Sequence, residues 1–166
     1  MKIIFLHGLE STPETSKTGN FLKSKIENLE IPEYNPATSD YDSIVNFFKT
    51  YFDENEDYIV IGTSIGGYWS LKLTEFTNVN KVILINPALK KGIEKYNSNL
   101  DVNPYVYGHM ILNKDDKIVN NEENIKQYND RFAITLFETG GHQCENIEEI
   151  TREIIDSLNL LSVWIP

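Results

Sequence analysis

The sequence has little cysteine, few basic residues and no long apolar run. Its single cysteine, Cys144, excludes an internal disulfide and is typical of a protein from a reducing compartment. The apolar run Ile3–Leu6 is far shorter than the roughly 7–15 residues of a signal-peptide core, and no stretch approaches the length of a membrane span. We therefore expect a cytoplasmic protein that does not insert into membranes.

Basic residues are outnumbered by acidic ones. The chain has 15 Lys and Arg against 25 Asp and Glu, which gives a net charge of −10 at pH 7. Nucleic acids and anionic membranes would repel such a surface, so we expect neither as a partner. The chain also lacks the Gly-x-Gly-x-x-Gly and P-loop motifs, which argues against a nucleotide-binding module.

The 166 residues, 40% of them hydrophobic, suit one globular domain over 1–166 with a substantial core. Strands are expected at Lys2–Leu6, Ile31–Tyr34, Tyr58–Ile61, Lys81–Ile85, Tyr105–Leu112 and Phe132–Phe137. Helices are expected at Ser11–Leu29, from a cap at Ser39–Asp42 to Phe52, and at Ile65–Phe76, Asn121–Tyr128 and Ile147–Leu158. This alternation predicts a three-layer α/β/α sandwich around a mainly parallel six-stranded sheet. The irregular stretch Pro87–Pro104 is expected to form at most a small lid or a pocket wall.

One pentapeptide, Gly62-Thr63-Ser64-Ile65-Gly66, directly follows the expected strand Tyr58–Ile61. A Gly-x-Ser-x-Gly sequence between a strand and a helix is typical of a nucleophile elbow, a sharp turn that lifts a serine hydroxyl above the sheet edge. The glycines give the incoming strand and the outgoing helix room to pass closely. Ser64 is therefore the leading candidate for a catalytic nucleophile.

Candidates for the acid and the base follow Ser64 in the chain order Ser, Asp, His of an α/β-hydrolase triad. Asp115 and Asp116 follow the expected strand Tyr105–Leu112, where a carboxylate would stand at the carboxyl edge of the sheet. His142 follows Gly140-Gly141, a pair that permits a tight bend toward Ser64. Each of these residues alone is an ordinary loop residue, but their order and spacing reinforce one another.

Several spaced segments together resemble the small YqiA-like esterases of the α/β-hydrolase superfamily. They are His7–Pro13 with Lys17, Gly62–Trp69, Asn86–Ala88, Asn103–Tyr105 and Gly140–His142. The resemblance implies a minimal α/β-hydrolase fold with little or no cap, and hydrolysis of short-chain acyl esters or thioesters without a cofactor. It also implies that Ser64 is the nucleophile, Asp116 the acid and His142 the base. Asp116 is favoured over Asp115 because Lys117-Ile118-Val119 after it matches the spacing of the family.

Further site residues are expected around this triad. The backbone N–H groups of Leu9 and Ile65 are the natural donors of an oxyanion hole. Tyr68 and Tyr96 are expected to line the substrate pocket, with ordinary core packing an equally good interpretation for Tyr68. No metal site is expected, because Cys144 near His142 lacks the spacing of zinc ligands.

Two questions stay open from the sequence alone. A non-catalytic binding protein on the same scaffold is the alternative to a serine hydrolase acting on a small acyl ester, because a fold does not prove a function. The apolar C-terminal segment 160–166 is expected either to pack on the body or to form a dimer contact, so both a monomer and a homodimer are compatible with it.

Overall fold

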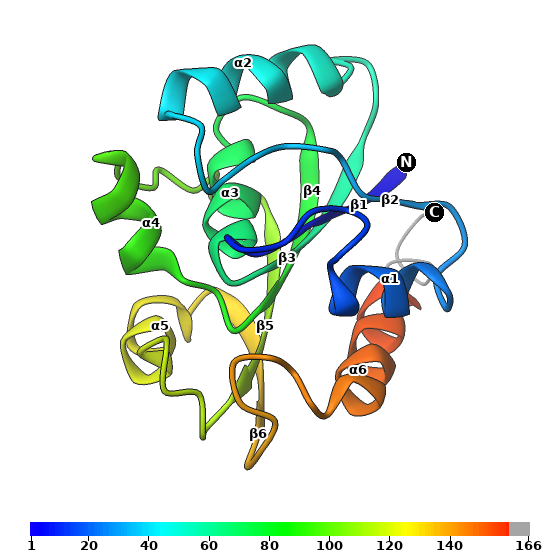
Figure 1. Cartoon of the computed structure of the whole chain (residues 1–166), viewed down its shortest axis with the longest axis vertical. Coiled ribbons are helices and arrows are strands. Elements are labelled where there is room, and N and C mark those ends of the chain that lie inside the picture. The colour runs from blue at the N-terminus through cyan, green and yellow to red at the C-terminus, as the bar shows by residue number, and fades with distance from the viewer. Residues whose placement is uncertain (160–166) are drawn as a thin grey trace.

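The structure, a computed structural model, describes residues 1–159 and consists of a parallel sheet between two layers of helices (Figure 1). The strands are β1 (Lys2–Leu6), β2 (Leu29–Glu30), β3 (Tyr58–Thr63), β4 (Val79–Ile85), β5 (Tyr107–Asn113) and β6 (Phe132–Phe137). The helices are α1 (Lys17–Lys23), α2 (Tyr41–Tyr51), α3 (Ile65–Leu73), α4 (Leu89–Tyr96), α5 (Asn121–Tyr128) and α6 (Ile147–Asn159). The predicted six-stranded α/β/α fold is confirmed.

The strand order in the sheet is β2-β1-β3-β4-β5-β6, and every neighbouring pair is parallel. The order reverses between β1 and β3, because the chain runs outward to β2 on one side and to β4, β5 and β6 on the other. Ligands of such open sheets bind beyond the carboxyl ends of the strands at this reversal. The loops after β1 and β3 are therefore expected to border a ligand site.

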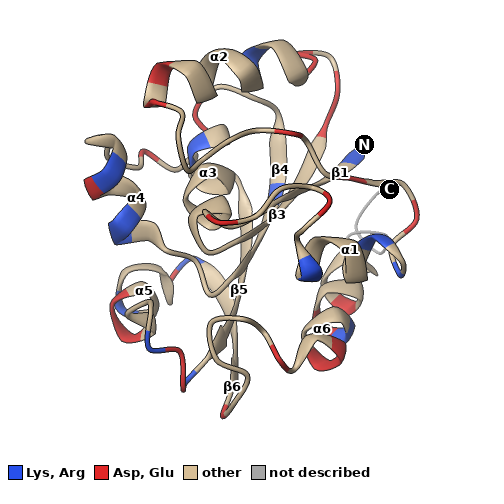
Figure 2. Cartoon of the chain, viewed as in Figure 1, with Lys and Arg blue, Asp and Glu red and all other residues tan. Residues whose placement is uncertain are grey.

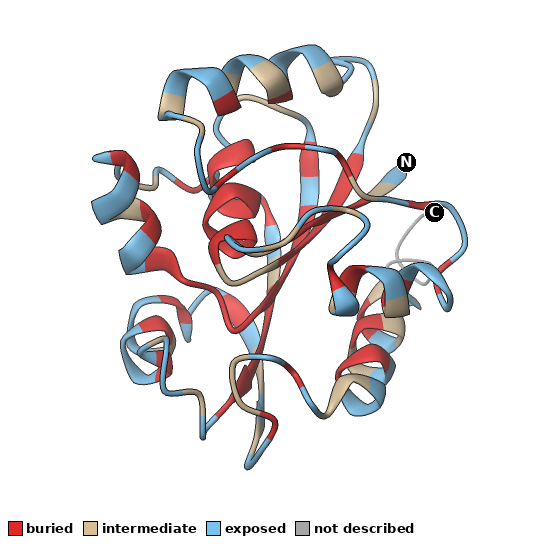
Figure 3. Cartoon of the chain, viewed as in Figure 1, coloured by how far each residue is buried: buried red, intermediate tan, exposed pale blue. Residues whose placement is uncertain are grey.

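The core has two parts, one on each face of the sheet. Alternate residues of a strand point to opposite faces, so Ile4 and Val60 pack in one cluster with α2, α3, α4 and α5, while Phe5 and Ile61 pack in the other with α1 and α6. Helix α3 is buried all round, whereas the outer helices bury a single face (Figure 3). A sheet that is covered on both faces gives the strand ends a rigid base.

The first helix is shorter than expected. It begins at Lys17, because Ser16 rather than Ser11 is its N-cap, and the Ser16 hydroxyl accepts a hydrogen bond from Gly19 N at 3.1 Å. Thr12 and Thr15 bond to each other in a turn before it. The expected helix from Ser11 to Leu29 is thus wrong at both ends, and its first turns are instead a loop beside the carboxyl end of β1.

Two other segments differ from the expected pattern. The expected strand Ile31–Tyr34 is wrong, since pairing with β1 stops at Glu30, and Pro32 has no N–H for a sheet hydrogen bond. The irregular stretch Pro87–Pro104 contains the eight-residue helix α4. No helix among residues 1–159 is long and apolar enough to cross a membrane, and the C-terminal segment 160–166 lies outside the described residues.

Candidate active site

Ser64 occupies a sharp turn between β3 and α3. Its backbone has φ 53° and ψ −121°, a region that non-glycine residues rarely adopt. Three backbone hydrogen bonds hold this conformation: Ser64 N donates to Ile85 O at 3.1 Å, and Ser64 O accepts from Gly67 N at 3.0 Å and Ala88 N at 2.8 Å. The end of β4 and the start of α4 thus fix the serine of the predicted elbow.

The two glycines of the elbow are required by close packing. A Cβ atom at Gly66 would lie 2.1 Å from the carbonyl oxygen of Leu6, and one at Gly62 would lie 2.4 Å from that of Gly66. These are backbone atoms that cannot move aside cheaply. The loop after β1 passes at ordinary contact distance from the serine, since a Cβ at Gly8 would lie 3.6 Å from the Cβ of Ser64. Close passage therefore brings the β1 loop to the serine.

His142 bridges Ser64 and Asp116. Its Nε2 lies 2.9 Å from Ser64 Oγ, and its Nδ1 lies 2.7 Å from Oδ2 of Asp116. The Asp116 side chain is fully buried and that of His142 is 14% exposed, so water reaches only one edge of the pair. The other Asp116 oxygen, Oδ1, accepts from the backbone N–H groups of Ile118 at 2.7 Å and Val119 at 3.1 Å. The structure thus brings together the serine, histidine and aspartate in hydrogen-bonded order.

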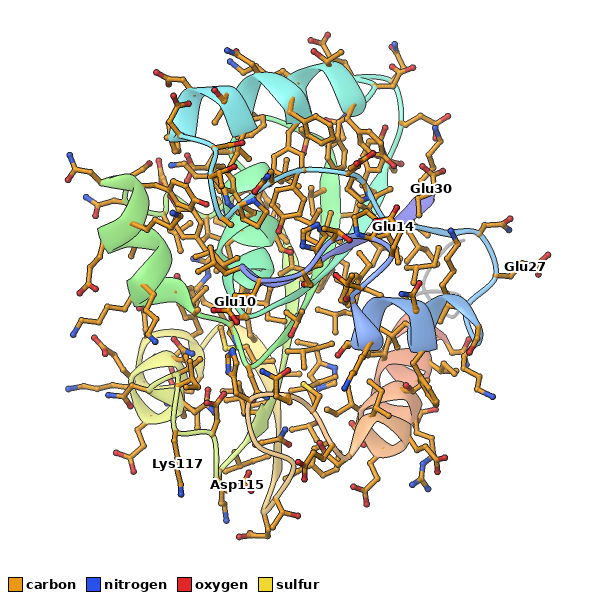
Figure 4. All side chains as sticks on the ribbon, in the orientation of Figure 1. Glu10, Glu14, Glu27, Glu30, Asp115 and Lys117 are labelled. Carbon is orange, nitrogen blue, oxygen red and sulfur yellow. The ribbon has the colours of Figure 1, made fainter. Side chains whose placement is uncertain are left out.

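Asp115 holds the loop that carries His142. Its Oδ1 accepts from Gly141 N at 2.7 Å and its Oδ2 from Gly140 N at 3.3 Å. Both glycines have positive φ, 137° at Gly140 and 58° at Gly141, so the loop needs a tie to keep this conformation. Figure 4 labels Asp115 on the segment between β5 and α5. Asp115 therefore fixes the loop that carries His142, although Asp116 is the residue bonded to the ring.

Two buried asparagines complete this tie, and sequence reasoning missed both of them. Asn86 at the end of β4 and Asn113 at the end of β5 both donate to the carbonyl oxygen of Gly141, at 3.1 and 2.9 Å. The Asn86 side chain also accepts from Asn113 N at 2.8 Å. The available signal was an asparagine at the carboxyl end of each of two neighbouring strands, but the shared partner is visible only in three dimensions.

A cleft of about 570 Å³ opens above Ser64 and His142. Its walls are residues 8–11 and 15–18, part of α4, and Ile118. Leu9 and Ile65, the expected oxyanion donors, both line it. Within residues 1–159, neither backbone N–H donates a hydrogen bond to another protein group. Both groups are therefore available to a ligand.

The expected contribution of Tyr68 and Tyr96 to the pocket is not found in this cleft. Tyr68 is fully buried and its hydroxyl donates to Ser98 O at 3.0 Å; Tyr96 is 8% exposed and its hydroxyl donates to Pro36 O at 2.9 Å. The two rings stack at a centroid distance of 5.6 Å inside the core, and neither lines the cleft. Burial raises the pKa of Tyr68 to about 12, so its phenol stays neutral. The core interpretation applies to both.

Cys144 and His7 are buried near the site, and neither lines the cleft. Cys144 is 3% exposed, and burial raises the pKa of its thiol to about 11, so it carries no thiolate at neutral pH. His7 is fully buried, its Nδ1 lies 2.9 Å from Gly8 O, and desolvation lowers its pKa. Among residues 1–159, no three His, Cys, Asp or Glu side chains form a group that could hold a metal ion.

The N-terminal part of the chain matches the model of a protein family. Residues 2–111, which include Ser64 but neither Asp116 nor His142, match the model of a family described as an uncharacterised protein family, UPF0227. No curated protein matches the chain.

Solved structures extend the comparison over almost the whole chain. A protein of the alpha/beta hydrolase superfamily from Xanthomonas campestris pv. campestris is similar with a TM-score of 0.77 at 18% identity, over 95% of this chain and 99% of that one. An esterase from Exiguobacterium antarcticum is similar with a TM-score of 0.71 at 14% identity, over 96% and 92%. Mouse alpha/beta hydrolase domain-containing protein 10 gives 0.70 at 16%, over 96% and 90%. At these identities the likeness establishes the α/β-hydrolase fold alone.

Proposed function

The chain belongs to the uncharacterised protein family UPF0227, the YqiA-like family, and we propose that it is a serine hydrolase of carboxylic esters. The observation that carries the proposal is the contact chain Ser64 Oγ to His142 Nε2 at 2.9 Å and His142 Nδ1 to Asp116 at 2.7 Å. A nucleophile within hydrogen-bond reach of a base, with the base oriented by a third group, is the arrangement that nucleophilic catalysis requires.

The proposed reaction proceeds in two halves. Ser64 Oγ attacks the ester carbonyl carbon while His142 Nε2 takes the hydroxyl proton, and the oxyanion that forms accepts from the N–H groups of Leu9 and Ile65. The intermediate collapses to an acyl ester on Ser64, and His142 returns the proton to the departing alcohol. Water, deprotonated by the same ring, then attacks the acyl carbon. The bond from that carbon to Ser64 Oγ breaks, His142 returns the proton to Oγ, and the carboxylic acid leaves. Asp116 keeps the His142 proton on Nδ1 throughout.

The cleft supports a small acyl group. Its 570 Å³ is within the range of sites for small molecules. Leu9 and Ile118, which are 37% and 52% exposed, are apolar side chains on its wall and offer a surface for a short chain. Helix α4 forms one wall from inside the stretch Pro87–Pro104, which was the candidate lid. We therefore propose short-chain esters or thioesters as substrates and no cofactor.

The test is the variant Ser64→Ala with 4-nitrophenyl acetate and a fluorophosphonate probe. The variant removes one hydroxyl, so we expect an unchanged melting temperature, no turnover above background and no probe labelling, whereas the wild type reacts with both reagents. Turnover by the variant at the wild-type rate would refute a serine mechanism. Failure of the wild type to bind the probe would favour the alternative of a non-catalytic binding protein on this scaffold.

A further inference from the structure

The cleft has a charge balance opposite to that of the whole chain. Its lining contains three lysines, Lys17, Lys91 and Lys95, and one acidic residue, Glu10, whereas the chain has 25 acidic against 15 basic residues. We propose that the site selects esters that carry an anionic group, such as a carboxylate, near the scissile bond. This inference rests on the proposed function, because it names the substrate class of the same site.

The three lysines come from two separate elements. Lys17 is the first residue of α1, and Lys91 and Lys95 lie on α4. Because the two α4 lysines are four residues apart, they share one face of the helix, and that face borders the cleft. Figure 2 shows basic residues on α4 and at the start of α1, on either side of the carboxyl ends of β1 and β3. A ligand above Ser64 therefore has positive charge on both sides.

These charges are not neutralised by the protein. Within residues 1–159, no carboxylate lies within 4 Å of the amino groups of Lys17, Lys91 or Lys95. Lys95 makes a long hydrogen bond to Ala37 O at 3.4 Å and lies 5.4 Å from the centroid of the Tyr96 ring, and neither contact neutralises its charge. By contrast, the neighbouring Lys90 is paired with Glu123 at 3.7 Å and does not line the cleft. The three lysines are thus free to interact with an anionic ligand.

Glu10 is the one negative side chain in the lining, and it opposes the same ligands. It lies on the loop after β1, beside Leu9, and Figure 4 labels it between the α4 side and the α1 side of the molecule. The three lysines outnumber Glu10 and the buried Asp116 behind His142, which leaves one excess positive charge to attract an anion. The lysines are exposed, so solvent and salt weaken each interaction, and the effect falls on encounter and binding rather than on the chemical step.

The apolar side chains in the cleft complete the recognition. Leu9 and Ile118 give an apolar surface in the same cleft as the lysines, so a short chain with a charged end satisfies both. The charged end belongs either to the acyl group or to the leaving group, because either part of the ester can approach a lysine wall. The shared chemistry is an anionic ester, and two substrate pairs distinguish the two positions of its charge.

The first pair compares mono-(4-nitrophenyl) glutarate with 4-nitrophenyl pentanoate, which tests charge on the acyl group. The second compares 4-acetoxybenzoate with phenyl acetate, which tests charge on the leaving group. For each pair we measure kcat/KM after subtracting the rate without enzyme. We expect the wild type to prefer the anionic member in at least one pair, and 0.5 M NaCl to reduce that preference.

Variants of the cleft residues test whether the lysines cause the preference for anionic esters. Exposed charge pairs contribute about 1.4- to fivefold each, so the triple change Lys17→Gln, Lys91→Gln and Lys95→Gln is expected to lower the anionic-to-neutral ratio about tenfold. Glu10→Gln is expected to raise the ratio about twofold. The matched control Lys90→Gln, on the same helix but outside the cleft, should leave it unchanged.

The outcomes separate the two proposals. A ratio near one in both pairs for the wild type, or a ratio that the triple change does not lower, overturns the inference, and Ser64-dependent hydrolysis of the neutral esters would still support the serine hydrolase. If no ester is hydrolysed in a Ser64-dependent way, the proposed function itself fails, and the inference fails with it.

Discussion

Replacing Asp116 with asparagine is expected to remove most of the turnover and to leave the fold intact. The Asp116 Oδ1 atom accepts from the N–H groups of Ile118 and Val119, and an amide oxygen can accept both bonds equally well. These two donors therefore fix which way the asparagine side chain faces. Its NH₂ group must then point at His142 Nδ1, in the place of the carboxylate oxygen that lies 2.7 Å away.

This orientation disables the base. Facing an NH₂ donor, His142 Nδ1 must act as an acceptor, so the ring proton moves to Nε2. Nε2 is the atom 2.9 Å from Ser64 Oγ, and once protonated it cannot take the serine proton. The same exchange in a serine protease lowers kcat by about 10⁴, which corresponds to about 5.4 kcal/mol of transition-state stabilisation at 1.36 kcal/mol per tenfold.

Asp115→Asn is the matched control, since it makes the same chemical change one residue away. Asparagine at this position keeps one oxygen for Gly141 N and loses the longer bond to Gly140 N, so kcat should fall by less than about tenfold. Both variants are compared with the wild type on 4-nitrophenyl acetate, with melting curves to verify folding. If Asp116→Asn retains a tenth of the wild-type kcat, or if Asp115→Asn has the larger effect, the assignment of the orienting carboxylate is wrong.

Two further predictions concern buried titratable groups. Burial raises the pKa of the Cys144 thiol to about 11, so the native protein should resist alkylation by iodoacetamide at pH 8. The variant Cys144→Ser should keep the wild-type rate of ester hydrolysis. Rapid alkylation of the folded protein would contradict the prediction of an unreactive thiol. Burial lowers the pKa of His7 and His109 below their ordinary value of 6.5. As the pH is lowered from 7.5 to 5.5, the unfolded chain therefore binds protons that the folded chain does not. The free energy of unfolding should decrease as the pH is lowered over this range. Denaturant titrations at both pH values measure this slope, which His109→Gln should make shallower; equal midpoints for the wild type at both pH values would count against it.

Local patterns were sufficient to predict most of the sheet. The predicted bounds of the helix Asn121–Tyr128 and the strand Phe132–Phe137 are those of α5 and β6, because polar residues flank each of these segments. The errors occur where a side chain changes the start of an element or removes a donor. Ser16, rather than Ser11, caps α1, and Pro32 ends the pairing of β2 early. Sequence patterns offer several candidate caps, and only tertiary packing selects among them.

The reacting residues of the proposed site could be predicted from the sequence, but the hydrogen bonds that hold their loops could not. Order along the chain was enough to propose Ser64, Asp116 and His142, since each follows a strand whose end meets the same edge. Asn86 and Asn113 could not be predicted as partners of Gly141. Their side chains come from the ends of two strands, and Gly141 lies on a loop far away in the sequence. The pocket role expected for Tyr68 and Tyr96 was not found for a similar reason: their rings stack on each other inside the core, a contact between α3 and α4 that sequence order does not show.

The proposed triad follows the ends of strands, whereas the lysines of the cleft lie on helices. The proposed triad lies on turns fixed by buried hydrogen bonds, such as Ser64 N to Ile85 O and Asn113 N to Asn86 Oδ1. A substitution that breaks such a bond, as at Asn86, leaves a buried group unpaired and costs about 1–3 kcal/mol. The lysines, in contrast, are exposed on α1 and α4, and surface substitutions usually change stability by less than about 0.5 kcal/mol. Charge preference can therefore be altered by substitution while the reacting groups keep their positions. For this reason the lysine variants test the choice of substrate separately from the chemistry at Ser64.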